Sequence, residues 1–147
     1  MADDFISWLD RAKSSLAISK NKSDDSIFYE DLCFQAQQAA EKALKGMLIF
    51  YDIEPERTHN LVLLIKDLSK HITIPIEINE AAILNDYAVQ TRYPGDYTPI
   101  EEEEYKNAIK IAENCVNWIE KKHNELSGKI NTEEKDQLYL DNSETKK

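Results

Sequence analysis

Residues 35–48 read QAQQAAEKALKGML, and this alanine-rich stretch decides the fold. Its apolar residues recur at steps of three and four, the spacing that places side chains on one face of an α-helix. The pattern continues outward, so we expect one long helix over about residues 24–51. The following residues should face the core: Phe28, Leu32, Ala36, Ala39, Ala40, Ala43, Leu44, Met47 and Leu48. Because small side chains allow close helix packing, this segment should lie at the centre of a bundle or against a partner subunit.

Other segments with helical periodicity surround this one. They predict helices over residues 4–19, 61–68, 79–92 and 99–122, with Thr58 or Asn60 as the cap of the second of these. Residues 71–78 alternate apolar and polar side chains but contain a proline, and we expect an extended connection there. The predicted fold class is therefore all-α, an antiparallel bundle of about five helices.

The bundle should occupy residues 1–125. Lys122 suits a helix end and Gly128 suits a left-handed stop, so we expect the last helix to finish in this region. The remaining segment, residues 126–147, is polar and should form a flexible tail.

Composition and charge narrow the class of protein. The chain has 147 residues, with 18 Lys and Arg against 28 Asp and Glu, so its net charge is -10. This charge argues against a general nucleic-acid binder and against RNA or a membrane as partner, but it permits a local basic patch. Cys33 and Cys115 lie in apolar stripes without metal-ligand spacing, so we expect buried thiols and no metal site. The acidic N-terminus and the lack of a long apolar run predict a cytoplasmic protein.

An unusual composition marks residues 91–99, TRYPGDYTP. A connection between two helices explains much of it. Pro94 and Gly95 fit the centre of a type II turn. Thr98 and Pro99 fit the cap and first position of the next helix.

Four side chains of this segment are not required by a connection: Arg92, Tyr93, Asp96 and Tyr97. An arginine suits a phosphate and a tyrosine ring suits a base, so these four are candidates for nucleotide binding. Lys42 and Lys45 could add positive charge to the same site. The alternative for these lysines is a surface role, because Glu41 and Lys45 have the i,i+4 spacing of an ion pair.

Three motifs taken in order resemble the HEPN domain family. They are QQAAEKALK at residues 37–45, THNL at residues 58–61 and RYP at residues 92–94. The resemblance covers about residues 5–122 and implies a helical bundle that commonly dimerises. It also implies a protein partner, because members are often encoded beside a minimal nucleotidyltransferase or fused to one.

Some HEPN members are ribonuclease toxins, whose active site is an arginine followed shortly by a histidine. After Arg92 the matching positions here are Tyr97, Thr98 and Pro99, and none is a histidine. A tyrosine near its ordinary pKa of about 10 is a poor general base at neutral pH. The resemblance therefore implies a non-catalytic binding module that binds a nucleotide, serves a nucleotidyltransferase as partner, or does both.

Two alternatives stay open. One is a degenerate ribonuclease that acts on RNA at a dimer cleft with a substitute for the missing imidazole. The other is a purely structural protein, which dimerises through the alanine-rich face of the long helix. His59 can face the same site or can pack at a helix end, the commoner role of a lone histidine. We expect no catalytic residue and no cofactor other than a nucleotide ligand.

Overall fold

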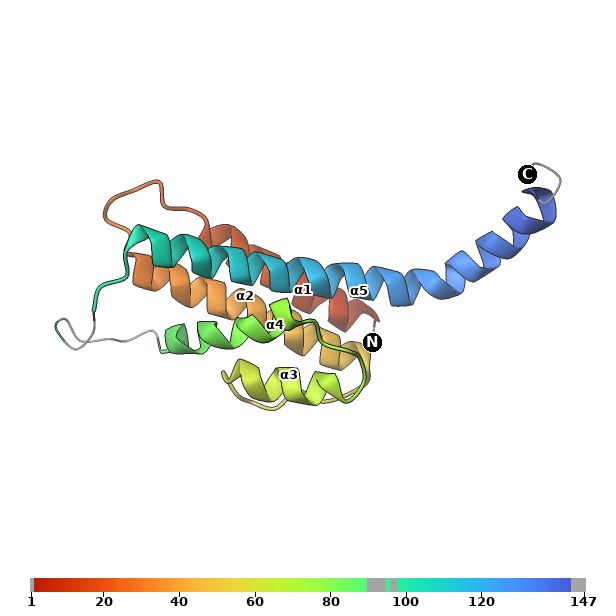
Figure 1. Cartoon of the computed structure of the whole chain (residues 1–147), viewed down its shortest axis with the longest axis horizontal. Coiled ribbons are helices and arrows are strands. Elements are labelled where there is room, and N and C mark those ends of the chain that lie inside the picture. The colour runs from red at the N-terminus through yellow and green to blue at the C-terminus, as the bar shows by residue number, and fades with distance from the viewer. Residues whose placement is uncertain (1, 90–94, 96–97, 144–147) are drawn as a thin grey trace.

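The computed structural model describes the backbone of residues 2–89, 95 and 98–143, and the side chains of residues 4–89, 95 and 98–128. Its elements are α1 (Ala2–Ser19), α2 (Tyr29–Phe50), α3 (Leu61–Ser69), α4 (Ile76–Asn79), the 3-10 helix η1 (Glu80–Tyr87) and α5 (Glu102–Ser143). Figure 1 shows α1, α2 and α5 running along one another, with α3, α4 and η1 on one side of them. The predicted all-α bundle is confirmed.

The central helix of the bundle is α2, which contacts α1, α3, η1 and α5. Its alanines at positions 36, 39, 40 and 43 are no more than 1% exposed. They therefore pack inside one chain. The alternative of a purely structural dimer requires these alanines to face a partner subunit, and they do not. Gly46 continues this close packing, because a Cβ atom at this position would lie 2.9 Å from Trp8 Cβ of α1.

The long helix begins later than predicted. The carboxylate of Asp24 accepts hydrogen bonds from the backbone N–H and the hydroxyl of Ser26, at 2.8 and 2.7 Å. These bonds close a separate turn, and α2 begins only at Tyr29, after an extended Phe28. Phe28 was expected in the core, but it is 63% exposed.

The region that follows α3 also differs from the prediction. Residues 76–79 are helical instead of extended, and the Pro75 carbonyl oxygen accepts hydrogen bonds from the N–H groups of Ile78 and Asn79. The predicted α-helix over 79–92 is a 3-10 helix from Glu80 to Tyr87 in the described residues. The buried residues of α4 and η1 recur at steps of three: Ile78 in α4, then Ala81, Leu84 and Tyr87 in η1. That period belongs to a 3-10 helix, which has three residues per turn.

The last helix differs at both ends. It begins at Glu102 instead of Pro99, and the backbone N–H of Tyr105 donates to the Glu101 carbonyl. It continues to Ser143, so Gly128 lies inside the helix and does not stop it. The flexibility of residues 126–147 stays a prediction. No helix in the described part of the chain is long and apolar enough to cross a membrane.

Candidate functional site

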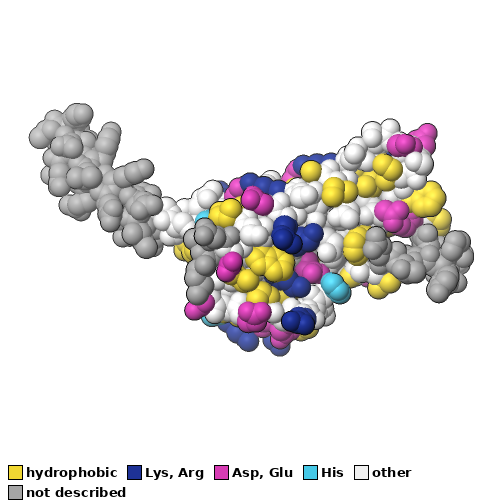
Figure 2. All heavy atoms as spheres, turned by 180° about the vertical axis from the view of Figure 1, so that it is seen from behind, with side chains coloured by type: hydrophobic (Ala, Val, Ile, Leu, Met, Phe, Trp, Pro, Cys, Tyr) yellow, Lys and Arg dark blue, Asp and Glu magenta, His cyan; other side chains and the backbone are white. Residues whose placement is uncertain are grey.

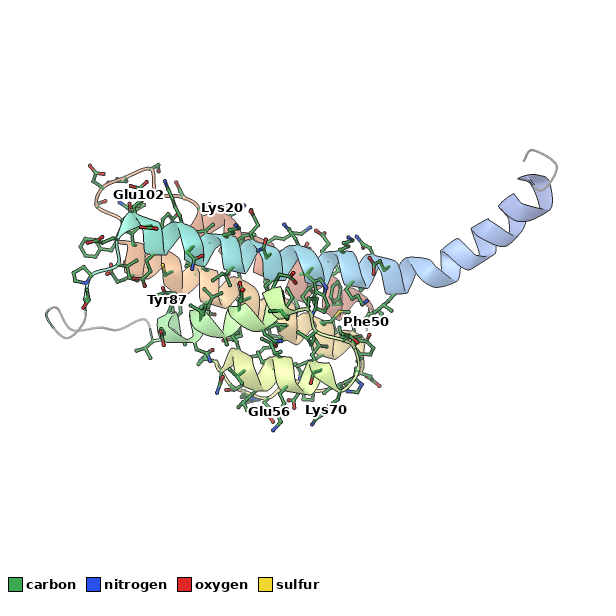
Figure 3. The ribbon with its side chains drawn as sticks, viewed as in Figure 1. Lys20, Phe50, Glu56, Lys70, Tyr87 and Glu102 are labelled. Carbon is green, nitrogen blue, oxygen red and sulfur yellow. The ribbon has the colours of Figure 1, made fainter. Side chains whose placement is uncertain are left out.

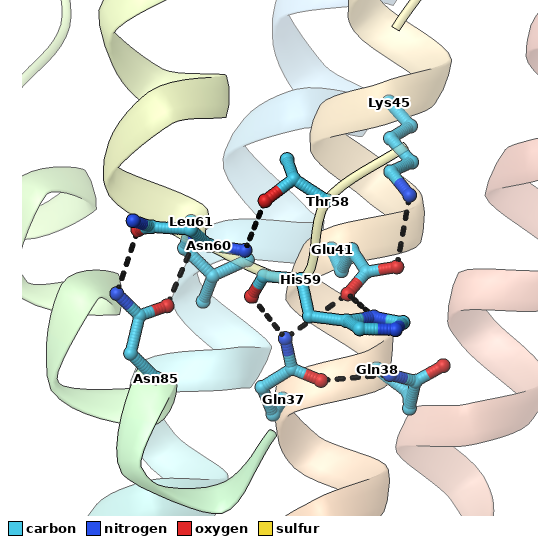
Figure 4. A network of polar contacts seen from close by, with 9 residues as sticks. All are labelled: Gln37, Gln38, Glu41, Lys45, Thr58, His59, Asn60, Leu61 and Asn85. Atoms are coloured by element: carbon cyan, nitrogen blue, oxygen red, sulfur yellow. Dashed lines mark hydrogen bonds and ion pairs between the residues drawn. The ribbon is translucent and has the colours of Figure 1, made fainter. Parts of the chain in front are cut away.

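A row of polar side chains follows one side of α2, between α1 and the loop that leads into α3. We call it the α2 polar strip and define it by these residues: Gln37, Gln38, Glu41, Lys42 and Lys45 of α2, Ser15 of α1, and His59 of the loop. The α2 members recur at steps of three and four, which brings them to neighbouring positions on the helix surface. The strip contains the polar residues of the QQAAEKALK motif, and Figure 4 shows most of it.

Glu41 lies at the centre of the strip, with a side chain only 6% exposed. Its Oε2 lies 3.1 Å from Lys45 Nζ, and its Oε1 lies 2.9 Å from His59 Nδ1 and 3.1 Å from Gln37 Nε2. A buried carboxylate is costly unless donors satisfy it, and here three donors do so. The predicted i,i+4 pair of Glu41 and Lys45 is present. It is nearly buried, however, because the Lys45 side chain is 12% exposed.

His59 is held by α2 at two points. Gln37 Nε2 donates to the His59 carbonyl oxygen at 3.0 Å, and Glu41 holds the ring through Nδ1. The side chain is nevertheless 69% exposed. An ionised carboxylate can only accept hydrogen bonds, so Nδ1 carries a proton in this arrangement. The ring is therefore fixed in orientation while its other nitrogen, Nε2, is left for the solvent or a ligand.

The start of α3 keeps its own backbone donors occupied. The N–H groups of Asn60, Leu61 and Val62 donate to the side chains of Thr58, Asn85 and Asn60, at 3.0, 2.8 and 3.0 Å. Asn85 Nδ2 also donates to Asn60 Oδ1 at 2.9 Å, which ties the THNL motif to η1. These amides are engaged, so an anion beside His59 would be bound by side chains instead of by the N-terminus of α3.

Lys42 lies toward α1, where its Nζ donates to Ser15 Oγ at 2.8 Å. Burial lowers the pKa of Lys42, and the charge of Arg11 lowers this pKa further, while Glu41 acts in the opposite direction. Arg11 of α1 and Lys42 therefore lie near each other. Figure 2 shows the face turned away in Figure 1, where Lys and Arg side chains are interspersed with Asp and Glu side chains beside an apolar patch.

The four candidates of the 91–99 segment, Arg92, Tyr93, Asp96 and Tyr97, lie outside the described residues. Lys42 and Lys45 are brought together on the strip, but each already has a polar partner. From the sequence, His59 was expected either to face the nucleotide site or to pack at a helix end. Its contact with Glu41 could not be found from spacing, because the two residues are 18 positions apart.

The described chain on either side of this segment is fixed to the bundle. Before it, the Tyr87 hydroxyl lies 2.5 Å from Glu104 Oε2. Burial and this hydrogen bond raise the pKa of Tyr87. After it, the backbone N–H of Ile100 donates to Glu30 Oε2 at 2.8 Å. Figure 3 shows Tyr87 toward the end of the bundle where α5 begins, near Glu102.

A separate hollow of about 530 Å³ lies between the α1–α2 loop and the start of α5. Of its lining lysines, Lys20 pairs with a carboxylate of α5, and Lys106 pairs with Glu102 at 2.8 Å. The third, Lys22, lies 5.1 Å from the centre of the Tyr29 ring. All three cations have partners, as the lysines of the strip do, and the hollow differs from the strip in having no histidine among its lining residues.

Metal chemistry has no support among the described residues, where no three His, Cys, Asp or Glu side chains could together hold a metal ion. Cys33 and Cys115 are buried and form no disulfide, as expected. Burial raises the pKa of Cys115 to about 12, which leaves its thiol protonated and unreactive at neutral pH.

Comparison with known proteins identifies relatives of this fold. The HEPN domain model matches residues 6–122, well over half of the chain. The crystal structure of TT1696 from Thermus thermophilus is similar with a TM-score of 0.71 and 28% identity, over 80% of this chain and 97% of that chain. The structure of ST0689, an archaeal HEPN homologue, is similar with a TM-score of 0.64 and 29% identity, over 80% of this chain and 96% of that one. No curated protein matches the chain significantly.

Proposed function

The chain belongs to the HEPN domain family, and on this premise we propose that it is a non-catalytic module that binds a nucleotide. It does so alone or as the partner of a minimal nucleotidyltransferase. The α2 polar strip is the observation that supports this function most. It combines an exposed, oriented imidazole with two lysines, in a chain whose net charge is -10. Local positive charge of this kind attracts phosphate despite a repulsive total charge.

In this function Arg92 contacts a phosphate, Tyr93 or Tyr97 stacks on the base, and Asp96 is available to the sugar hydroxyls. Next to the strip, the hydrogen bond between Asn60 and Asn85 joins the start of α3 to η1.

The proposed module acts as a homodimer, as HEPN domains often do. Its dimer interface must lie away from the alanines of α2, since these are buried within one chain. Sedimentation of the purified protein tests this point, and a monomer at all concentrations would remove dimerisation from the proposal.

Calorimetric titration with ATP, GTP and their diphosphates tests nucleotide binding. We expect saturable heat with the wild-type protein and at least a tenfold loss of affinity in Arg92→Ala, because one charge-assisted phosphate contact contributes about 1.5–3 kcal/mol. A control variant, Lys110→Ala, removes an exposed charge on α5 and should bind as the wild type does. Equal affinities of the Arg92→Ala and wild-type proteins would remove Arg92 from the site.

A degenerate ribonuclease is the second candidate, and one observation favours it. The contact between Glu41 and His59 supplies an oriented imidazole of the kind that general acid–base catalysis uses. Incubation with labelled RNA separates the two functions. The binding module predicts no cleavage above that of the Arg92→Ala control. Cleavage that is lost in both Arg92→Ala and His59→Ala would instead establish the ribonuclease.

A further inference from the structure

Exposed apolar side chains gather in one part of the bundle. Of the eight large apolar side chains that are exposed in the described chain, five lie between residues 62 and 89. Among these, Val62 belongs to α3, Ile76 to α4 and Ile83 to η1. Figure 1 shows these three elements together on one side of α2. We call this surface the α3–η1 face. An apolar surface of this kind is typical of a protein–protein interaction site.

A groove of about 370 Å³ lies on the α3–η1 face, between α3 and the segment formed by α4 and η1. Val62, Ile65, Lys66 and Ser69 line it on the α3 side, with Asn79 and Ala82 on the other. The two walls are tied together, because the Asn85 side chain of η1 hydrogen-bonds to the Leu61 N–H and to Asn60 at the start of α3. The groove is therefore already formed in the single chain.

The two sides of the groove carry opposite charges. On α3, Asp67 and Lys70 lie 3.6 Å apart and compensate each other, which leaves Lys66 as an exposed cation. On the other side, Glu77 of α4 and Glu80 of η1 are exposed carboxylates. The side chains of Lys66, Glu77 and Glu80 take part in no hydrogen bond or ion pair among the described residues. Their charges are therefore available to a partner.

A partner with charge of a single sign would match only one side of this groove, whereas a second copy of the chain matches both. In an isologous interface a contact between two residues is made twice, once in each direction. We propose that the α3–η1 face binds a second copy of this chain, with α3 of each subunit against η1 of the other and Lys66 opposite Glu80. This inference rests on the homodimer proposed above and assigns its interface.

Sedimentation velocity over a range of protein concentrations tests the apolar part of the interface. Ile83→Glu places a carboxylate on η1, and the control Ile18→Glu places the same group on α1 at a matched site, since the two isoleucines are 52% and 49% exposed. We expect Ile83→Glu to weaken the dimer by roughly tenfold or more, because it buries an unpaired charge at the interface. Ile18→Glu should dimerise as the wild type does, and circular dichroism checks that both variants are folded.

An exchange of charges tests the symmetry of the interface. Lys66→Glu and Glu80→Lys each place like charges opposite each other twice in the dimer, so each should weaken it by roughly tenfold. The double variant restores opposite charges and keeps the net charge of -10. Its dissociation constant should return to within about threefold of the wild-type value. A double variant as weak as the single ones would overturn the pairing of Lys66 with Glu80.

The outcomes separate this inference from the proposed function. A wild-type dimer that neither Ile83→Glu nor Lys66→Glu weakens would overturn the α3–η1 face as the interface and leave homodimerisation in place. A wild type that is monomeric at every concentration would overturn both, while the titration with ATP still tests nucleotide binding. Binding of a nucleotidyltransferase by this monomer that Ile83→Glu abolishes would assign the face to that partner and refute a second copy as its occupant.

Discussion

At the scale of single residues, Glu41 determines what the strip can do. One buried carboxylate holds Lys45, His59 and Gln37, which come from two different parts of the chain. The sequence predicts the Lys45 contact, because residues four apart on a helix are neighbours. It does not predict the His59 contact, which depends on how the α2–α3 loop returns along α2. The lysines were therefore identified as candidates from the sequence, whereas the oriented imidazole required the structure.

Two glutamate–lysine pairs with the same spacing allow a matched test of burial. In Glu41→Gln, Lys45 keeps its charge at 12% exposure without a counter-charge, so we expect a loss of about 1–3 kcal/mol in the free energy of unfolding. In Glu102→Gln the partner Lys106 is 69% exposed and solvated, so stability should not change measurably. Urea unfolding of both variants measures the difference. Equal losses in the free energy of unfolding would show that burial does not determine how much Glu41 contributes to stability.

At the scale of elements, helix periodicity predicts the core better than it predicts helix ends. The buried faces of α1, α2 and α5 follow the predicted spacing, and Asn60 caps α3 by accepting from Val62 N–H. The 3-10 geometry of η1 was missed because its period of three was interpreted as the α-helical pattern. The start of α5 was missed because Ile100 donates to Glu30, a tertiary contact that local turn propensities do not contain.

The packing of α1 on α2 depends on Gly46. An alanine favours a helix over glycine by up to about 1 kcal/mol, but its Cβ would lie 2.9 Å from Trp8 Cβ. Trp8 Cβ adjoins the backbone and cannot move without moving α1. We therefore expect Gly46→Ala to lower the free energy of unfolding by about 1–3 kcal/mol, as overpacked cores do. Thermal unfolding measures this, with Gly128→Ala in α5 as the control for helix propensity. A Gly46→Ala variant more stable than the wild type would show that α1 and α2 can move apart without a loss of stability.

At the scale of the whole molecule, burial makes the fold sensitive to alkaline pH. The folded-state pKa of Cys115 is about 12, above its ordinary value of 9.0, and burial also raises the pKa of Tyr51, Tyr87 and Tyr105. The folded state therefore binds more protons than the unfolded state above pH 9. The stability from these groups is complete below about pH 9 and is lost as the pH rises.

Unfolding by urea at pH 7.5, 9.0 and 10.5 measures this dependence. We expect the free energy of unfolding to fall between pH 9.0 and 10.5, because the thiol and phenol groups ionise more readily once exposed. The free energy of unfolding of the Cys115→Ala variant should fall less over the same interval, although the smaller side chain lowers its stability at every pH. A wild-type stability that rises across this interval would contradict the burial of these groups.

Nucleotide binding at the α2 polar strip is tested most directly by following backbone amide resonances while ATP is added. The predicted result is a saturable shift of amides in residues 37–45 and at His59, with smaller changes elsewhere in the bundle. The contradicting result is either no shift at saturating ATP or a shift confined to residues 20–25. All of the latter residues except Asp24 line the hollow beside α5, so such a shift would place the ligand there instead.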